Sequence, residues 1–235
     1  MNIPMLSMLT RGHSTGSTPS HVALIAEGIE GWATKQDIDY CRTLRQSIGA
    51  LRCAANAAIR FKIPYLTIDF RSATRYFSGK GASKLFQIGL EEWLHDLSVR
   101  GANIRVKGSE MDFASSKIRK IDNENIEIFL CLECDSRKEI VEAVRRLARE
   151  VVSGEIQANN INVNKISEKI SPLNLPDPDL IIGMSRDQSL SNFLLWQAAY
   201  AEFYFLPIDW PDFGEADFEM AIQDYARRHR RFGGR

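Results

Sequence analysis

Residues that could bind a metal ion and phosphate groups follow short apolar runs of the chain. Glu27 comes directly after the first run, and a carboxylate at such a position can hold a divalent metal ion. Gly28 lets the backbone approach a bound anion, and Trp32 can anchor the helix into which this loop leads. Arg71 and Arg75 follow the second run, and a planar guanidinium group is suited to gripping phosphate. Arginines in exposed loops are also ordinary, so these two are candidates for phosphate contacts.

The elements that must position these residues alternate along the chain. Short β-branched runs are separated by longer segments whose apolar residues recur at spacings of three and four. Repeated strand, helix and strand units are typical of an α/β fold, here a single domain with a mainly parallel, about six-stranded sheet and helices on both faces. Ligands of such sheets bind where strands end and loops lead into helices. The pattern predicts strands over 21–26, 65–70, 104–107, 126–132, 180–182 and 202–206, and helices over 39–61, 82–100, 111–121, 136–152 and 217–230.

Length and charge narrow the class of protein. The chain has 235 residues, enough for one large core, and 30 basic residues balance 30 acidic ones, so we expect no nucleic-acid partner. Residues 1–20 lack the apolar run of a signal peptide and are predicted to be a flexible leader before a domain over 21–235. Apolar stretches of about 18 residues, as membrane spans require, do not occur. We therefore expect a soluble cytoplasmic protein, which an apolar substrate or partner could still draw into peripheral membrane contact.

A C-x-x-C pattern lies between a predicted strand and a predicted helix. Cys131 and Cys134 stand where a redox motif or half of a zinc site would be placed. The second half of a zinc site is missing, and so are the Trp and Pro that usually accompany the redox motif. Two ordinary buried thiols at the end of a strand are therefore the preferred interpretation.

The carboxy-terminal third carries the densest signature. It contains S-N-F-L-L-W-Q over 191–197, A-Y-A-E-F-Y-F over 199–205, W-P-D-F over 210–213 and R-R-F-G-G over 230–234. This block closely resembles the cis-prenyltransferases, the family of undecaprenyl diphosphate synthase, whose members condense isopentenyl diphosphate onto an allylic diphosphate. The loop H-V-A-L-I-A-E-G-I-E-G-W-A over 21–33 also resembles the family's H-V-A-x-I-M-D-G-N-G-R-W-A.

The resemblance implies roles for further residues. Glu27 takes the place of the family's magnesium-binding aspartate, so the expected cofactor is Mg²⁺ and the expected ligand an isoprenyl diphosphate. Arg137, Ser191 and Asn192 are expected to support the diphosphate, together with Glu202 as a second carboxylate of the metal site.

Several cations of the family pattern are replaced in this chain. Gly31 stands where the family has an arginine of the first loop, and Gly183 and Ser189 stand where it has two arginines that grip isopentenyl diphosphate. An arginine and a histidine of the first long helix align with Tyr40 and Leu44. Each lost charge-assisted contact costs about 1.5 to 3 kcal/mol, so four of them amount to roughly 6 kcal/mol or more, a factor of about 10⁴ in affinity.

Acidic residues are added to the predicted carboxyl edge of the sheet. They could hold a divalent metal ion bound to a diphosphate in place of the lost cations, or they could be solvated residues of a relaxed site. The acids in question are Glu27, Glu30, Glu133, Asp135, Asp187 and Glu202.

Two hypotheses about function remain open. The chain is an enzyme acting on allylic diphosphates with an altered outcome, either a short condensation or a terpene-synthase-like ionisation. Alternatively, it is a pseudoenzyme or the noncatalytic subunit of a heteromeric cis-prenyltransferase, which pairs with an intact homologue and lends its 231–234 tail. The aromatic carboxy-terminal block needs a deep core or a partner subunit, and the resemblance implies a homodimer or such a heterodimer.

Overall fold

Six parallel strands form one sheet in the computed structural model, which describes residues 18–77, 83–108, 126–170, 175–184 and 188–228. The strand order is β3-β4-β2-β1-β5-β6, and all five neighbouring pairs are parallel. The predicted α/β fold with six parallel strands is therefore confirmed. The strands are β1 His21–Ile25, β2 Tyr65–Asp69, β3 Asn103–Lys107, β4 Glu127–Cys131, β5 Leu180–Met184 and β6 Glu202–Leu206.

The described helices include four of the five that periodicity predicts. The fifth predicted helix, over 111–121, lies outside the described residues. Three short helices were not predicted, because each is too brief to show a clear period. The helices are α1 Ile29–Gln36, α2 Tyr40–Arg60, α3 Arg71–Phe77, α4 Ser83–Val99, α5 Ser136–Val152, α6 Val163–Ile170 and α7 Glu215–Arg227, with 3₁₀ turns η2 Ala158–Asn160, η3 Gln197–Tyr200 and η4 Trp210–Asp212.

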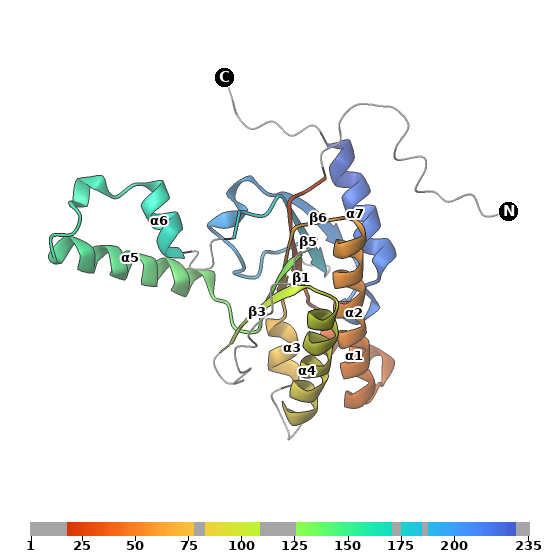
Figure 1. Cartoon of the computed structure of the whole chain (residues 1–235). Helices are drawn as coiled ribbons and strands as arrows, with labels where there is room; N and C mark the ends of the chain where they lie inside the picture. Colours follow the sequence, from red (N-terminus) through yellow and green to blue (C-terminus); the bar gives the residue numbers. More distant parts are fainter. Residues whose placement is uncertain (1–17, 78–82, 109–125, 171–174, 185–187, 229–235) are drawn as a thin grey trace.

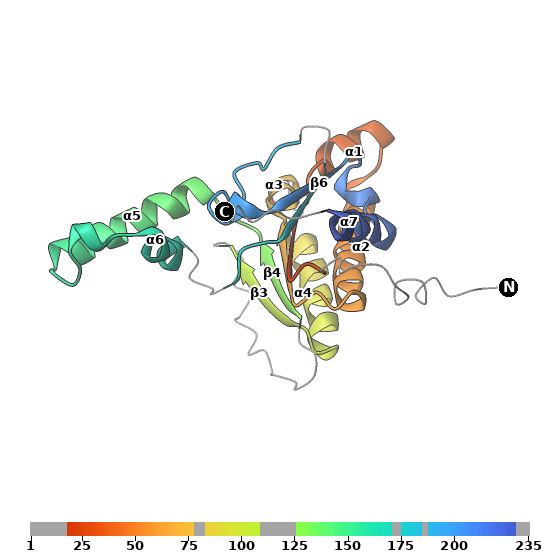
Figure 2. The ribbon, with the colours of Figure 1, turned by 90° about the horizontal axis from the view of Figure 1, so that it is seen from above.

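The two faces of the sheet carry different covers (Figures 1 and 2). Helices α2, α4 and α7 lie on one face, where they form the larger apolar core with alternate residues of the strands. The other face carries a smaller core, in which Ile25 and Phe129 pack against Phe193 of the 188–201 segment. Successive strand residues point to opposite faces, so the same short strands supply both cores.

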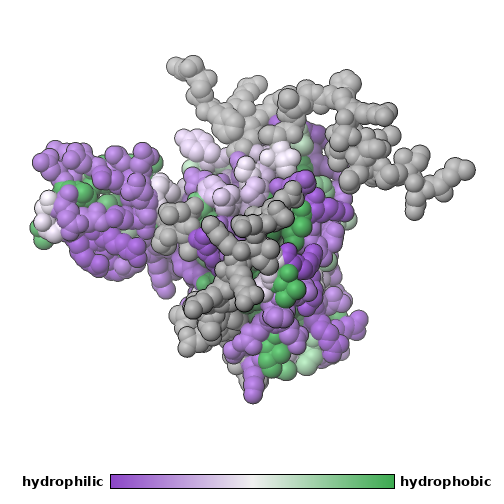
Figure 3. Space-filling view, in the orientation of Figure 1, coloured by the Kyte–Doolittle hydropathy of each residue, from purple (hydrophilic) through white to green (hydrophobic). Residues whose placement is uncertain are grey.

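An arm made of α5 and α6 projects from the body of the molecule (Figure 1). Asp135 caps the start of helix α5, since its carboxylate accepts a hydrogen bond from the backbone N–H of Lys138 at 3.0 Å, and the helix packs mainly against α6. In Figure 3 the arm is a mostly hydrophilic lobe with apolar patches. Among the described residues, none of the helices is both long enough and apolar enough to span a membrane.

Candidate active site at the carboxyl edge of the sheet

The loop after β1 is held by the segment that follows β6. The backbone N–H of Trp210 donates to the carbonyl oxygen of Glu27 at 2.8 Å. Gly28 has φ of 87°, and a Cβ atom at this position would lie 2.2 Å from Oδ1 of Asp209. Only glycine combines this left-handed backbone with so close an approach. The predicted role of Gly28 in shaping the loop thus agrees with the geometry.

Trp32 anchors the helix that leads away from this loop. Its indole N–H donates to Oδ1 of Asp212 at 2.8 Å, and the residue is buried. Lys35, on the last turn of α1, pairs with Oδ2 of Asp209 at 3.1 Å. Sequence reasoning missed both aspartates, although the W-P-D-F motif that contains Asp212 was conspicuous.

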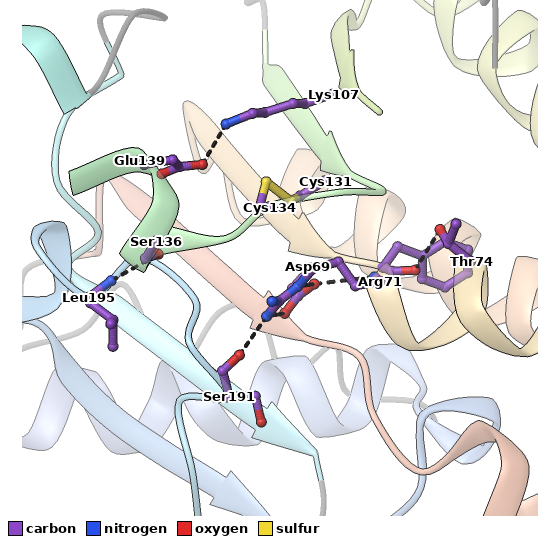
Figure 4. The surroundings of a disulfide bond; sticks show 11 residues. Asp69, Arg71, Thr74, Lys107, Cys131, Cys134, Ser136, Glu139, Ser191 and Leu195 are labelled. Carbon is purple, nitrogen blue, oxygen red and sulfur yellow. Dashed lines mark hydrogen bonds and ion pairs between the residues drawn. A yellow bond between two sulfur atoms is a disulfide. The ribbon is translucent and has the colours of Figure 1, made fainter. Parts of the chain in front are cut away.

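Arg71 is fixed by two neighbours at the end of β2 (Figure 4). Its Nε and Nη2 atoms donate to the carboxylate of Asp69 at 2.8 and 2.6 Å, and Nη2 also donates to the carbonyl oxygen of Ser191 at 2.7 Å. The hydrogen bonds to Asp69 raise the pKa of Arg71, and the charges of Asp69, Glu27 and Asp135 act in the same direction, against desolvation. The arginine predicted as a phosphate contact therefore already has an anionic partner.

Asn192 covers the amino-terminal end of α5. Its carbonyl oxygen accepts from the backbone N–H of Ser136 at 3.3 Å, and its side-chain oxygen accepts from the backbone N–H of Arg137 at 3.2 Å. Its side-chain nitrogen donates to Asp135 at 2.8 Å. The first N–H groups of α5, which would otherwise suit an anion, are thus satisfied from within the chain.

Two of the predicted phosphate contacts remain accessible. Arg75 lies on α3 and Arg137 on α5, both are exposed, and neither guanidinium group forms an ion pair with a described residue. Lys35 and Lys107, in contrast, pair with Asp209 and Glu139. Arg75 and Arg137 are therefore two described cations that a diphosphate at this edge could use.

Glu202 lies at the opposite edge, which corrects the prediction that it joins Glu27. It is the first residue of β6 and stands level with Leu180, the first residue of β5, whereas Glu27 follows the end of β1. Its carboxylate accepts from Arg228 at 2.9 Å. Because all six strands are parallel, the first residue of a strand lies at the amino edge, so one chain cannot bring both carboxylates to one ion.

The positions of the replaced cations differ in how much room they offer. A Cβ atom at Gly31 would meet nothing within 4 Å, whereas one at Gly183 would lie 2.6 Å from Cδ1 of Phe205 on β6. The ring of Phe205 thus occupies the space beside Gly183. Asp187 and the 231–234 tail, both named in the sequence analysis, lie outside the described residues.

Cys131 and Cys134 form a disulfide, which corrects the expectation of two thiols (Figure 4). The bond joins the end of β4 to the residue before Asp135, where α5 is capped. In the described parts of the chain, groups of three or more His, Cys, Asp or Glu residues placed to hold a metal ion do not occur.

Comparisons with known proteins agree with this architecture. A family model described as putative undecaprenyl diphosphate synthase matches residues 25–233. Isoprenyl transferase 2 of Bradyrhizobium diazoefficiens is 36% identical over 96% of this chain and 94% of its own length. Isoprenyl transferase of Brucella abortus is 35% identical over 93% of this chain and 91% of its own. The chain is also similar to the crystal structure of lavandulyl diphosphate synthase from Lavandula x intermedia in complex with dimethylallyl diphosphate, with a TM-score of 0.80 and 27% identity. The match covers 92% of this chain and 99% of that one.

Proposed function

Because this chain belongs to the cis-prenyltransferase family, the family of undecaprenyl diphosphate synthase, we propose that it transfers isoprenyl groups from a short allylic diphosphate with Mg²⁺ as cofactor. The loop after β1 carries the proposal. Glu27 is half-buried there, and its carboxylate makes no hydrogen bond to the described residues, while Gly28 gives the loop the left-handed turn that lets Asp209 pack against it. A carboxylate without a hydrogen-bond partner among the described residues, at the carboxyl edge of the sheet, is the chemistry that a metal-bound diphosphate needs.

Glu27 would hold the magnesium ion. Mg²⁺ is usually bound by one or two carboxylates, several waters and the phosphate oxygens of a substrate, so a single protein carboxylate fits it. The ion, when bound, would offset the negative charge of the leaving diphosphate. Arg75 and Arg137 would bind the diphosphate oxygens.

A short substrate is favoured by the apolar core beneath the loop. Phe70 follows β2, and its ring lies 5.8 Å from that of Trp210 and 6.0 Å from that of Phe86. The ring of Phe86 lies in turn 5.0 Å from that of Phe77, and all four side chains are fully buried. Large rings that fill this core leave less room for a long isoprenyl chain. Dimethylallyl or geranyl diphosphate is therefore the proposed donor, in either a short condensation or an ionisation.

The test is a magnesium-dependent assay with dimethylallyl, geranyl and farnesyl diphosphate, each with and without isopentenyl diphosphate. Glu27→Gln keeps the shape of the side chain but removes its charge, and we expect at least a hundredfold loss of turnover. Glu27→Asp restores the residue type of the family and is the matched control, which we expect to stay active. If the chain turned over none of the three donors, the proposal would be contradicted.

Gly31→Arg provides an independent experiment on the same site. The position is open, so the substitution restores an arginine of the family pattern without a clash. One charge-assisted contact is worth about 1.5 to 3 kcal/mol, so we expect KM for the allylic diphosphate to fall about 10-fold or more. An unchanged KM would mean that the diphosphate does not lie beside α1.

We further propose that the chain works as a homodimer through the arm. Val141, Val144 and Val152 line one side of α5 and are 47%, 54% and 89% exposed. Valines at helical spacing on a projecting hairpin are costly to leave in water, and a second copy of the arm would cover them. Of the two explanations for the aromatic block, a deep core applies to Phe193 and Trp210, which are buried within their own chain.

Sedimentation of the purified chain tests this association. Val144→Lys is expected to shift the protein from dimer to monomer, whereas Val99→Lys, at the end of α4 and 68% exposed, should leave the mass unchanged. A wild-type chain that sediments as a monomer at micromolar concentration would refute the homodimer.

The second candidate function is that of a noncatalytic subunit. It is favoured by the commitment of Arg71 to Asp69 and by the cover that Asn192 places over α5, since both leave fewer groups for a substrate. This candidate predicts that the chain co-purifies with an intact homologue, and that the activity of the homologue depends on the 231–234 tail of this chain. A stable homodimer that ignores the homologue would exclude it.

A further inference from the structure

The Asp69 carboxylate holds the Arg71 guanidinium group in one plane. Asp69 is the last residue of β2 and is 3% exposed, and its carbonyl oxygen accepts from the backbone N–H of Ala26 at 3.1 Å. Its carboxylate accepts from the backbone N–H, Nε and Nη2 of Arg71 at 3.2, 2.8 and 2.6 Å. A bidentate pair on a rigid strand end leaves the guanidinium group little freedom to turn.

The same guanidinium group ties down a segment 120 residues further along the chain. Nη2 donates to the carbonyl oxygen of Ser191 at 2.7 Å. Ser191, Asn192 and Leu194 have φ angles of 47°, 61° and 48°, a left-handed conformation that side chains other than glycine rarely adopt. Residues held in this region persist only where their surroundings fix them, and they gather at active sites.

The surroundings of the segment supply two ties. On one side Ser136 donates its backbone N–H to Asn192 and accepts the backbone N–H of Leu195 at its hydroxyl oxygen, at 3.3 Å each. On the other side, among the described residues, Arg71 donates to the carbonyl oxygen of Ser191. Loss of Arg71 would leave the left-handed turn hydrogen-bonded to the α5 side alone, with Phe193 still packed in the smaller core.

Arg71 is poorly placed to grip a diphosphate by itself. Its charge is neutralised by Asp69, and the charges of Glu27 and Asp135 lie close enough to act on it. A phosphate that took over the guanidinium group would leave the buried carboxylate of Asp69 with the backbone N–H of Arg71 as its remaining described partner, which is unfavourable.

We propose that Asp69 and Arg71 are positioning residues, which hold Ser191 and Asn192 in the conformation needed for substrate binding. The proposal rests on the proposed function, because it assigns the pair a role in that same site. It also separates two uses of an arginine. A positioning arginine needs Asp69 and the bidentate fork, whereas a phosphate-gripping arginine is restrained by Asp69 and needs only its charge.

Three variants distinguish the two uses. Asp69→Asn and Arg71→Gln break the tie, and Arg71→Lys keeps the charge without the fork. For a positioning pair we expect all three variants to raise KM for the diphosphate substrate about 10- to 100-fold, the effect of one charge-assisted hydrogen bond, with a smaller change in kcat. Arg60→Gln breaks an exposed pair with Glu219 between α2 and α7 and is the control that should change neither constant.

Amide hydrogen exchange provides a readout that does not need turnover. We expect the backbone of 188–195 to exchange at least tenfold faster in Asp69→Asn and Arg71→Lys than in the wild type, while that of 40–60 is unchanged and circular dichroism shows that the variants are folded. Normal exchange in 188–195, or tighter substrate binding by Asp69→Asn because Arg71 has been released, would overturn the inference. A wild type without turnover would instead refute the proposed function, and exchange would still decide whether the pair fixes the segment.

Discussion

The loop after β1 offers a matched pair of glycines for one quantitative prediction. Gly28→Ala and Gly31→Ala add the same methyl group three residues apart, at the start of the same helix. At Gly28 the new Cβ would lie 2.2 Å from Oδ1 of Asp209 on a backbone with φ of 87°, whereas at Gly31 it would meet nothing within 4 Å. We expect the two substitutions to change the free energy of unfolding in opposite directions.

The magnitude follows from two costs at Gly28. A left-handed backbone costs a residue with a Cβ about 1–2 kcal/mol. Asp209 must also move and give up its pair with Lys35, which is worth at most about 1 kcal/mol because the lysine side chain is 62% exposed. Gly28→Ala should therefore lower the free energy of unfolding by about 1–3 kcal/mol. Gly31→Ala should raise it by about 0.5–1 kcal/mol, since alanine loses less backbone entropy in a helix.

Thermal and urea unfolding monitored by circular dichroism measure both effects. For a chain of this length, 1 kcal/mol corresponds to a shift in Tm of roughly 2–4 °C. We expect Gly28→Ala to lose transferase activity as well, because the loop that approaches the diphosphate is displaced. Equal stability of Gly28→Ala and the wild type would refute the argument that the loop is docked on Asp209.

Three further predictions concern other parts of the fold. Gly183→Arg places a Cβ atom 2.6 Å from the ring of Phe205, so it should fail to restore the arginine of the family pattern and should lower the free energy of unfolding by about 1–3 kcal/mol. Phe205→Ala, added to this variant, should recover part of that free energy in urea unfolding. No recovery would contradict the clash as the reason. Burial lowers the pKa of His21 from 6.5, so the unfolded chain takes up the proton first and the free energy of unfolding should fall as pH drops below 6.5. His21→Gln should reduce this pH dependence. An unaltered pH dependence would exclude His21 as its cause. Reduction of the Cys131–Cys134 disulfide opens a loop of sequence separation 3 and should lower the free energy of unfolding, measured in urea, by about 1.6 kcal/mol. Alkylation of both cysteines in the unreduced, denatured chain would show that the bond is absent.

Local patterns were sufficient to predict the architecture. Apolar runs such as 180–182 and 202–206 lie in two parallel strands, β5 and β6, because a strand that is covered on both faces carries apolar residues at successive positions. The same strand assignment already implied the true place of Glu202. As the first residue of a parallel strand it belongs to the amino edge, and only the aligned position in the family suggested otherwise.

The candidate site was predicted less completely. Arg71 was recognised by its type, but its partner Asp69 was read only as the end of a strand, and the carbonyl group of Ser191 gives no signal in a sequence. The C-x-x-C spacing allowed a disulfide, a metal site or two thiols, because spacing alone does not determine the oxidation state. Asp209 went unnoticed because its importance lies in a contact with Gly28, 181 positions earlier.

The sequence by itself determined the alternation of strands and helices, the glycine of the first loop and the family, since these depend on short-range periodicity and on local motifs. Only the tertiary structure decided which charges remain available for chemistry. Arg71 is occupied by Asp69 and Ser191, while Arg75, one helical turn later, is exposed. The physical reason is that a charge is neutralised by whatever lies within a few ångströms of it, and the parallel sheet brings together residues more than 100 positions apart.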